Sequence, residues 1–155
     1  MIGAAMAMDL IVAGVAFWFS QLVSTDAVKS ACITPSKSMA QAIEARMHDG
    51  RIHVDQVRVV EAGDTRYESM FFTSAKVRVA GVGVGIGTWA SNVRDFGPGD
   101  FRGWDHTPSY YTLWPVNDLA RAISSGGGVT LNDPGMTHAA RFSQGCTSGT
   151  VGPTK

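Results

Sequence analysis

Charged residues are scarce in this chain, and neither sign is in excess. Its 155 residues include 13 Lys and Arg and 13 Asp and Glu, so the formal net charge is zero and the charged fraction is 17%. A polybasic nucleic-acid binder needs an excess of cations to neutralise phosphates, so we expect no nucleic-acid partner. The hydrophobic fraction of 45% is too high for an intrinsically disordered chain.

Motifs that mark common catalytic and metal sites are also absent. The chain has no HExxH, GxSxG or CxxC motif, and neither GxGxxG nor GxxxxGK[ST] occurs. His48 and His53 lie with Asp49 and Asp55 around a predicted helix end, a pattern more typical of exposed polar residues than of a metal site. We therefore expect no catalytic residue, no metal and no cofactor, and hence no enzyme.

The first 23 residues contain one ionisable side chain, Asp9. A membrane-spanning helix needs about 20 mainly apolar residues, and Trp18 would lie at its interface with water. The alternatives are a cleaved signal peptide, with Thr25 and Ala27 near the cleavage site, and a buried soluble helix. We expect a transmembrane anchor or signal-anchor over 1–23 and a polar tether over 24–31.

Two cysteines, Cys32 and Cys146, lie near the two ends of the remaining chain. One pair that spans a domain behind an export-like segment favours a disulfide, and two unrelated buried thiols are the alternative. The disulfide would place a domain over 32–146 outside the cytoplasm, followed by a flexible tail over 147–155.

The spacing of apolar residues favours an α+β fold. Three segments show helical spacing after a capping residue or a proline, namely 34–50, 115–125 and 133–142. Four segments alternate as strands do, namely 52–59, 70–79, 80–92 and 110–114. The alternation of apolar and polar residues shifts by one position between Val54 and Val57. This shift indicates a bulge, or a strand that begins only at Gln56. The expected fold is an antiparallel meander of three or four strands, packed by about three helices.

Glycine occupies every second position of the third predicted strand. Gly81, Gly83, Gly85 and Gly87 share one side, and Trp89 continues their parity. A strand side without side chains needs a close neighbour, so we expect either a packed helix or bend, or a ligand groove. In the groove alternative, the floor consists of Gly83, Gly85, Gly87 and Trp89.

A long loop begins at Arg94 and precedes the fourth predicted strand. It concentrates aromatic residues and is called the aromatic loop below. Asp95, Asp100 and Asp105 offset its arginines, which disfavours single-stranded nucleic acid as a partner. Aromatic residues and arginine are common anchors of protein interfaces, although the rings could instead fold back over the sheet as a lid. In the interface alternative, the contact residues are Phe101, Arg102, Trp104, His106, Tyr110 and Tyr111.

The chain resembles a known family between Cys32 and Cys146. The most specific pieces are GIGTWASN, which includes Trp89, and LWPVNDLA. They are similar to segments of small membrane-anchored proteins of unknown function from actinobacteria or their phages. The resemblance implies a spanning helix, an extracytoplasmic domain and a cysteine near the C-terminus, but no activity. The chain departs from the family in its aromatic loop and in its glycine alternation.

These patterns predict a single-pass membrane protein with its C-terminal domain outside the cytoplasm. We expect a binding or accessory module that is tethered by 1–23 and contacts another envelope protein through the aromatic loop. The alternative is a secreted or periplasmic domain that binds a small molecule or lipid over the glycine-rich strand. An envelope hydrolase is a third and weaker hypothesis.

Overall fold

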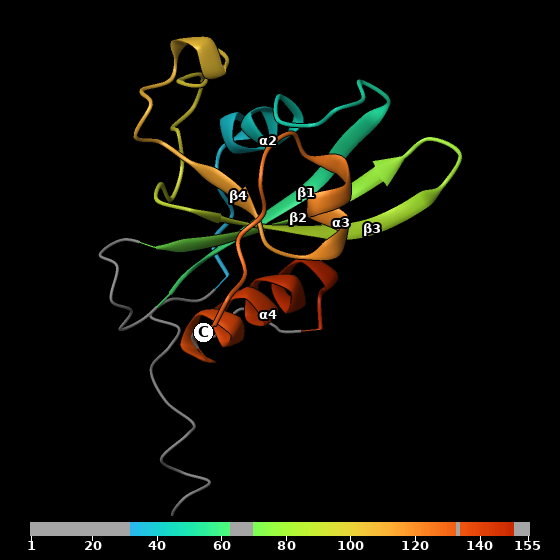
Figure 1. Cartoon of the computed structure of the whole chain (residues 1–155), viewed down its shortest axis with the longest axis vertical. Helices are drawn as coiled ribbons and strands as arrows, with labels where there is room; N and C mark the ends of the chain where they lie inside the picture. The colour runs from blue at the N-terminus through green and yellow to red at the C-terminus, as the bar shows by residue number, and fades with distance from the viewer. Residues whose placement is uncertain (1–31, 63–69, 133, 151–155) are drawn as a thin grey trace, which may run out of the picture.

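The computed structural model of the chain describes residues 32–62, 70–132 and 134–150 (Figure 1). These residues form an α+β domain that combines a four-stranded antiparallel sheet with three α-helices and one short 3-10 helix. The fold class predicted from the sequence is confirmed. The elements in chain order are α2 (Lys37–Glu44), β1 (Ile52–Glu61), β2 (Phe71–Val79), β3 (Gly83–Ser91), η1 (Trp104–His106), β4 (Leu113–Pro115), α3 (Asp118–Ile123) and α4 (Pro134–Ser148).

The predicted anchor over 1–23 and tether over 24–31 lie outside the described residues. Within the described part of the chain, no helix has the length and apolar character needed to cross a membrane. The tail predicted from residue 147 begins inside a helix, because α4 continues to Ser148 and buries Thr147.

The sheet is a meander with the strand order β1-β2-β3-β4, so each strand pairs with its neighbours in sequence. The register shifts between Val54 and Gln56, where the change of parity predicts a bulge. β3 begins at Gly83 rather than at residue 80. Gly81 lies in the preceding turn with a φ of 79°, a left-handed conformation that favours glycine, so its place in the alternating pattern reflects the turn and not the strand.

Helices cover both faces of the sheet, and Figure 1 shows α2 and α4 on opposite sides of it. One face packs against α2 and α3 and forms the first core, which contains Met39, Ile43, Ile52, Val57, Ala75, Val77, Trp89, Leu113, Ala120 and Ile123. The other face packs against α4 and forms the second core, which contains Val60, Ala62, Phe72, Ala90, Met136, Ala139, Ala140 and Cys146. Burial on both faces explains why β2 is buried at five successive positions from Phe71 to Ala75.

A buried hydroxyl cluster fixes α4 to the sheet. Ser74 Oγ lies 2.7 Å from Ser143 Oγ and 3.0 Å from Thr88 Oγ1. Thr147 Oγ1 donates to the Ser74 carbonyl at 3.1 Å, and Gln144 Nε2 donates to Thr88 Oγ1 at 2.9 Å. Because each of these polar groups has a partner, the cluster avoids the cost of unpaired burial and specifies how α4 is rotated against the strands.

The helix α2 begins later than the sequence predicts. Its N-cap is Ser36 rather than Thr34, and it ends at Glu44 instead of continuing to residue 50. The Asp95 carboxylate accepts hydrogen bonds of 2.7 Å from both the backbone N and the Oγ of Ser36. A negative charge from a distant loop thus lies at the positive end of the helix dipole, a contribution that local sequence does not reveal.

Side chains and a short bridge cover parts of the sheet edge at β1. Glu44 Oε1 accepts a hydrogen bond of 2.9 Å from the backbone N of Val54. Ile33 and Val59 exchange two backbone hydrogen bonds of 2.9 Å. The backbone of β1 is therefore already paired on its outer side at two places.

Asn117 joins the helix α3 to β3. Its Oδ1 accepts from the backbone N of Thr88 at 3.0 Å and of Ala120 at 3.1 Å, and its Nδ2 donates to the Ile86 carbonyl at 2.8 Å. One amide therefore caps a helix and extends the edge pairing of β3 beyond the short β4. The motif LWPVNDLA contains this residue.

Cys32 and Cys146 form a disulfide, with Cα atoms 5.6 Å apart. This confirms the predicted pairing over the alternative of two separate thiols. The bond links the start of the described domain to α4. Disulfides persist in oxidising compartments, so the bond suggests that the domain is extracytoplasmic.

Candidate functional site

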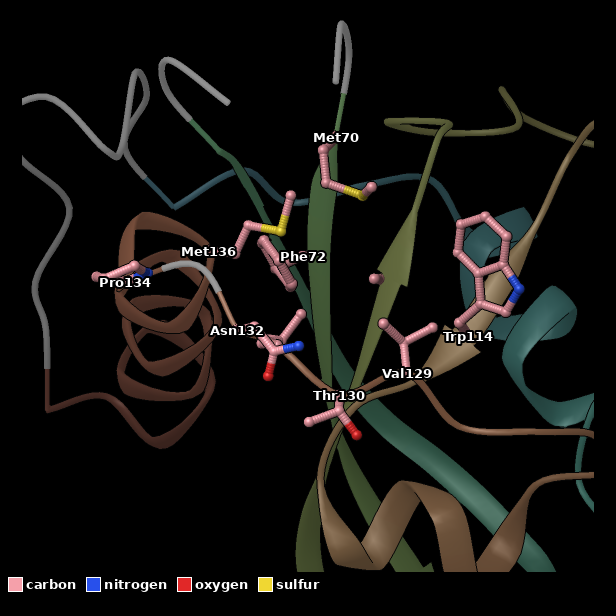
Figure 2. Close-up of a pocket in the computed structure, with 10 residues that line it drawn as sticks. Met70, Phe72, Trp114, Val129, Thr130, Asn132, Pro134 and Met136 are labelled. Atoms are coloured by element: carbon pink, nitrogen blue, oxygen red, sulfur yellow. The ribbon is translucent and has the colours of Figure 1, made fainter. Parts of the chain in front are cut away.

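A cavity of about 650 Å³ lies between the sheet and the segment that leads into α4 (Figure 2). Figure 2 shows Met70, Phe72 and Met136 on one side of it and Val129 and Trp114 on the other. Protein pockets for small ligands typically measure about 300–1,000 Å³, so this cavity has the size of a ligand site. Its lining residues are Met70, Phe72, Ala90, Trp114, Val129, Thr130, Leu131, Asn132, Pro134 and Met136.

The register of the sheet explains the shape of this apolar cavity. Ala90 of β3 pairs with Phe72 of β2 on one side and with Trp114 of β4 on the other. A small side chain therefore lies between two aromatic ones on the same face, which leaves a depression in the floor. Because the backbone N of Val129 donates to the Pro115 carbonyl at 2.9 Å, the chain after α3 is held beside β4 and forms the opposite wall.

The lining of the apolar cavity is chemically simple. None of its ten described residues is ionisable, and the polar side-chain groups are those of Thr130 and Asn132 together with the indole N–H of Trp114. Trp114 is 37% exposed, so its ring is open to solvent at the cavity. Thioether and aromatic side chains adapt to apolar ligands of varied shape. The arrangement suits binding of an apolar group and offers no pair of acid and base within this lining.

The aromatic loop, residues 94–112, packs against α2. Trp104 Nε1 donates to the Ala42 carbonyl at 3.1 Å, and the Arg46 guanidinium carbon lies 3.8 Å from the centre of the Trp104 ring. Phe96 contacts three other rings edge-on, those of Phe101, Trp104 and Tyr111. Phe96 and Trp104 also pack against the first core. Most of the rings therefore stabilise the loop itself.

The predicted contact residues of this loop fall into two groups. Half-buried within the ring cluster are Phe101, Trp104 and Tyr111. Exposed to solvent are Arg102, His106 and Tyr110. Tyr110 has 66% of its surface exposed, and its hydrogen bond with Tyr111 raises the pKa of Tyr111. A partner would thus meet the second group, and the binding role of the loop stays a prediction.

Neighbouring side chains fill the glycine side of β3 at Gly85 and Gly87. A side chain at Gly85 would collide with Leu119 of α3, and one at Gly87 would collide with the indole of Trp89. Trp89 is fully buried, and its Nε1 donates to Ser124 Oγ at 2.9 Å. Gly83, at the exposed start of β3, has open space around it. Close packing accounts for Gly85 and Gly87, and the apolar cavity lies elsewhere on the sheet.

The histidines do not gather with other metal-ligating side chains. Across residues 32–62, 70–132 and 134–150, no group of three or more His, Cys, Asp or Glu side chains could hold a metal ion. Asp49 instead pairs with Arg51 at 2.7 Å, and this hydrogen bond lowers the pKa of the Asp49 carboxyl.

Comparison with other proteins gives no relative for this chain. It has no significant match among family models, curated proteins or solved structures. The resemblance to actinobacterial membrane-anchored proteins therefore stays a prediction.

The apolar cavity was not predicted from the sequence. Its residues come from four separate segments, and only their pairing in the sheet brings Phe72, Ala90 and Trp114 together. A signal present in the sequence is the short alternating stretch Val129–Leu131, between the glycine run and the last predicted helix. Arg46, which stacks on Trp104, was also not predicted from the sequence as a site residue.

Proposed function

We propose that this chain is an extracytoplasmic binding domain whose apolar cavity takes up a small hydrophobic ligand. The observation that carries the proposal is the cavity of about 650 Å³ over the depression at Ala90. In the same proposal, residues 1–23 hold the domain at the outer face of a cell membrane as a single-pass anchor. The disulfide supports the location outside the cytoplasm, and the scarcity of charge in 1–23 supports the anchor.

Chemistry and size together favour a binding role over a catalytic one for this cavity. Burial of apolar surface contributes about 25 cal/mol per Å², so a ligand that fills an apolar cavity gains most of its affinity from contact area. The polar groups of Thr130 and Asn132 can orient such a ligand. This proposal keeps the ligand class of the small-molecule alternative but moves its site from the glycine-rich strand to the region around Ala90.

The neutral fluorescent probe N-phenylnaphthylamine tests the proposal. We expect its fluorescence to rise saturably with the domain, and Ala90→Phe to weaken binding by about tenfold or more, because a ring at this position fills the depression. Ala122→Phe is the matched control, since Ala122 is exposed on α3 and does not line the apolar cavity. Absence of probe binding, or equal binding by both variants, would reject the proposal.

A second proposed function is contact with another envelope protein through the aromatic loop. The specific observation is Tyr110, a large side chain that is 66% exposed, in a loop that also exposes Arg102 and His106. Tyrosine and arginine are enriched at the energetic centres of interfaces.

Crosslinking in native membranes can test the loop contact. We expect Tyr110→Ala to abolish a crosslinked species that Val82→Ala retains, since Val82 is 84% exposed in the turn between β2 and β3. The prediction fails when both variants give the same crosslinked products as the unmodified chain.

A further inference from the structure

A second cavity, of about 390 Å³, lies beside the apolar one and has a different chemical character. Arg46 is its one ionisable lining residue, and no carboxylate lines it. Trp114 and Val129 line both cavities, so the two spaces border the same pair of residues. The remaining residues of the second cavity are Thr112, Leu113, Pro115, Ser125, Gly126, Gly127 and Gly128.

Arg46 is a cation without a counter-charge in the part of the chain that the structure describes. None of the described ion pairs includes it, and its buried Nε has no hydrogen-bond partner there. Partial burial lowers the pKa of Arg46, although a guanidinium remains charged at neutral pH. A positive charge that has lost part of its water without gaining an anion is an unfavourable arrangement, which binding of an anion would relieve.

The stacking on Trp104 holds the guanidinium in a suitable orientation. Its carbon lies 3.8 Å from the centre of the ring, so the indole covers one flat side of the group. The N–H donors of a guanidinium lie in its plane, so stacking does not cover them; because Nε is buried, the two Nη groups are the donors that remain for a ligand. A planar fork of donors matches the oxygen atoms of a carboxylate or a phosphate.

The glycine segment, residues 126–128, forms a wall of the second cavity that carries no side chains of its own. Ser125 donates two hydrogen bonds of 2.8 Å to the Arg46 carbonyl, from its backbone N and from its Oγ, and so fixes the start of the glycine segment beside Arg46. Gly126 and Gly127 have no atom within 4 Å of the position that a Cβ would occupy. At Gly128 the Arg121 side chain lies against that position, so the open space of this segment is at Gly126 and Gly127.

We propose that the two cavities form one site for an amphiphilic anion, in which Arg46 binds a carboxylate or phosphate group and the apolar cavity holds the hydrocarbon part. This inference rests on the proposed function, because it names the class of ligand that the apolar cavity accepts. Trp114 and Val129, which line both cavities, would contact the ligand where its polar end meets its chain.

Displacement of bound N-phenylnaphthylamine separates this inference from the proposed function. Decanoate and decyl phosphate are compared with decanol, all below the concentrations at which they aggregate. We expect the better of the two anions to displace the probe about ten- to a hundredfold more effectively than decanol, the range for a charge-assisted hydrogen-bond pair. The order of the two anions identifies the preferred acidic group.

The variant Arg46→Gln should remove this advantage, so that the anions displace the probe no more effectively than decanol does. Arg51→Gln is the matched control, because Arg51 is exposed, pairs with Asp49 and lines neither cavity. Arg46→Lys, which keeps the charge but not the planar fork, should retain part of the advantage. The thermal unfolding midpoint of each glutamine variant should equal that of the unmodified domain, which shows that both variants fold.

The possible outcomes are distinguishable. When the probe binds but decanoate, decyl phosphate and decanol displace it equally, the anion site is rejected and the proposed function stands. The same holds when Arg46→Gln and Arg51→Gln weaken the anions equally. When the probe does not bind at all, the proposed function is rejected and the inference falls with it.

Discussion

Replacement of both Cys32 and Cys146 by serine is expected to lower the free energy of unfolding of the domain by about 4–5 kcal/mol. The disulfide closes a loop with a sequence separation of 114 residues, and a crosslink over such a length restricts the unfolded chain strongly. Because domains of this size are stable by only about 5–15 kcal/mol, much of the total stability depends on this bond.

Urea unfolding of the oxidised domain, the reduced domain and the double serine variant measures this contribution. The reduced domain and the variant should agree, since both lack the crosslink. In the oxidised domain, Cys32 and Cys146 should not react with an alkylating reagent until a reductant is added. Equal urea midpoints for the oxidised and reduced forms, or free thiols in protein isolated without reductant, would contradict the prediction.

Replacement of Trp89 by alanine is expected to cost about 3–5 kcal/mol of unfolding free energy. Trp89 is fully buried in the first core, where its ring also fills the space left by Gly87, and its Nε1 donates to Ser124. Truncation would leave a void beside the central strands together with an unpaired hydroxyl. Trp89→Phe keeps most of the ring but loses the hydrogen bond, so its cost should be smaller.

Trp114→Ala is the matched control for this measurement. Trp114 occupies the neighbouring strand but is 37% exposed and borders a cavity, so its truncation should cost only about 1–2 kcal/mol. Chemical denaturation of the three variants gives the comparison. Equal losses for Trp89→Ala and Trp114→Ala would show that Trp89 does not hold the first core together.

Much of the fold could be predicted from the sequence because its signals are local. Alternation at Ile52–Val59 and Phe71–Val79, the parity change at the bulge and the two cysteines each indicate the observed structure. Helix ends were less predictable, since the N-cap of α2 depends on Asp95, which lies 59 residues further along the chain.

The candidate site could not be predicted, because it depends on pairing between distant segments. Ala90 carries no functional signal in the sequence, and its importance arises only from the two aromatic side chains that flank it across the sheet. Arg46 follows the end of α2 and is indistinguishable by pattern from an ordinary surface residue. Its lack of a counter-charge becomes visible only when the surrounding side chains are in place.

The coverage of the sheet edges affects how copies of this protein associate at high concentration. An open strand edge is a template for pairing with another chain, and thus a route to aggregation. Here Glu44 and Ile33 cover β1, the amide of Asn117 covers β3, and β4 is short and ends in Pro115. The described strands therefore offer little uninterrupted backbone for strand addition, so aggregation by edge-to-edge pairing is disfavoured even at high local concentration.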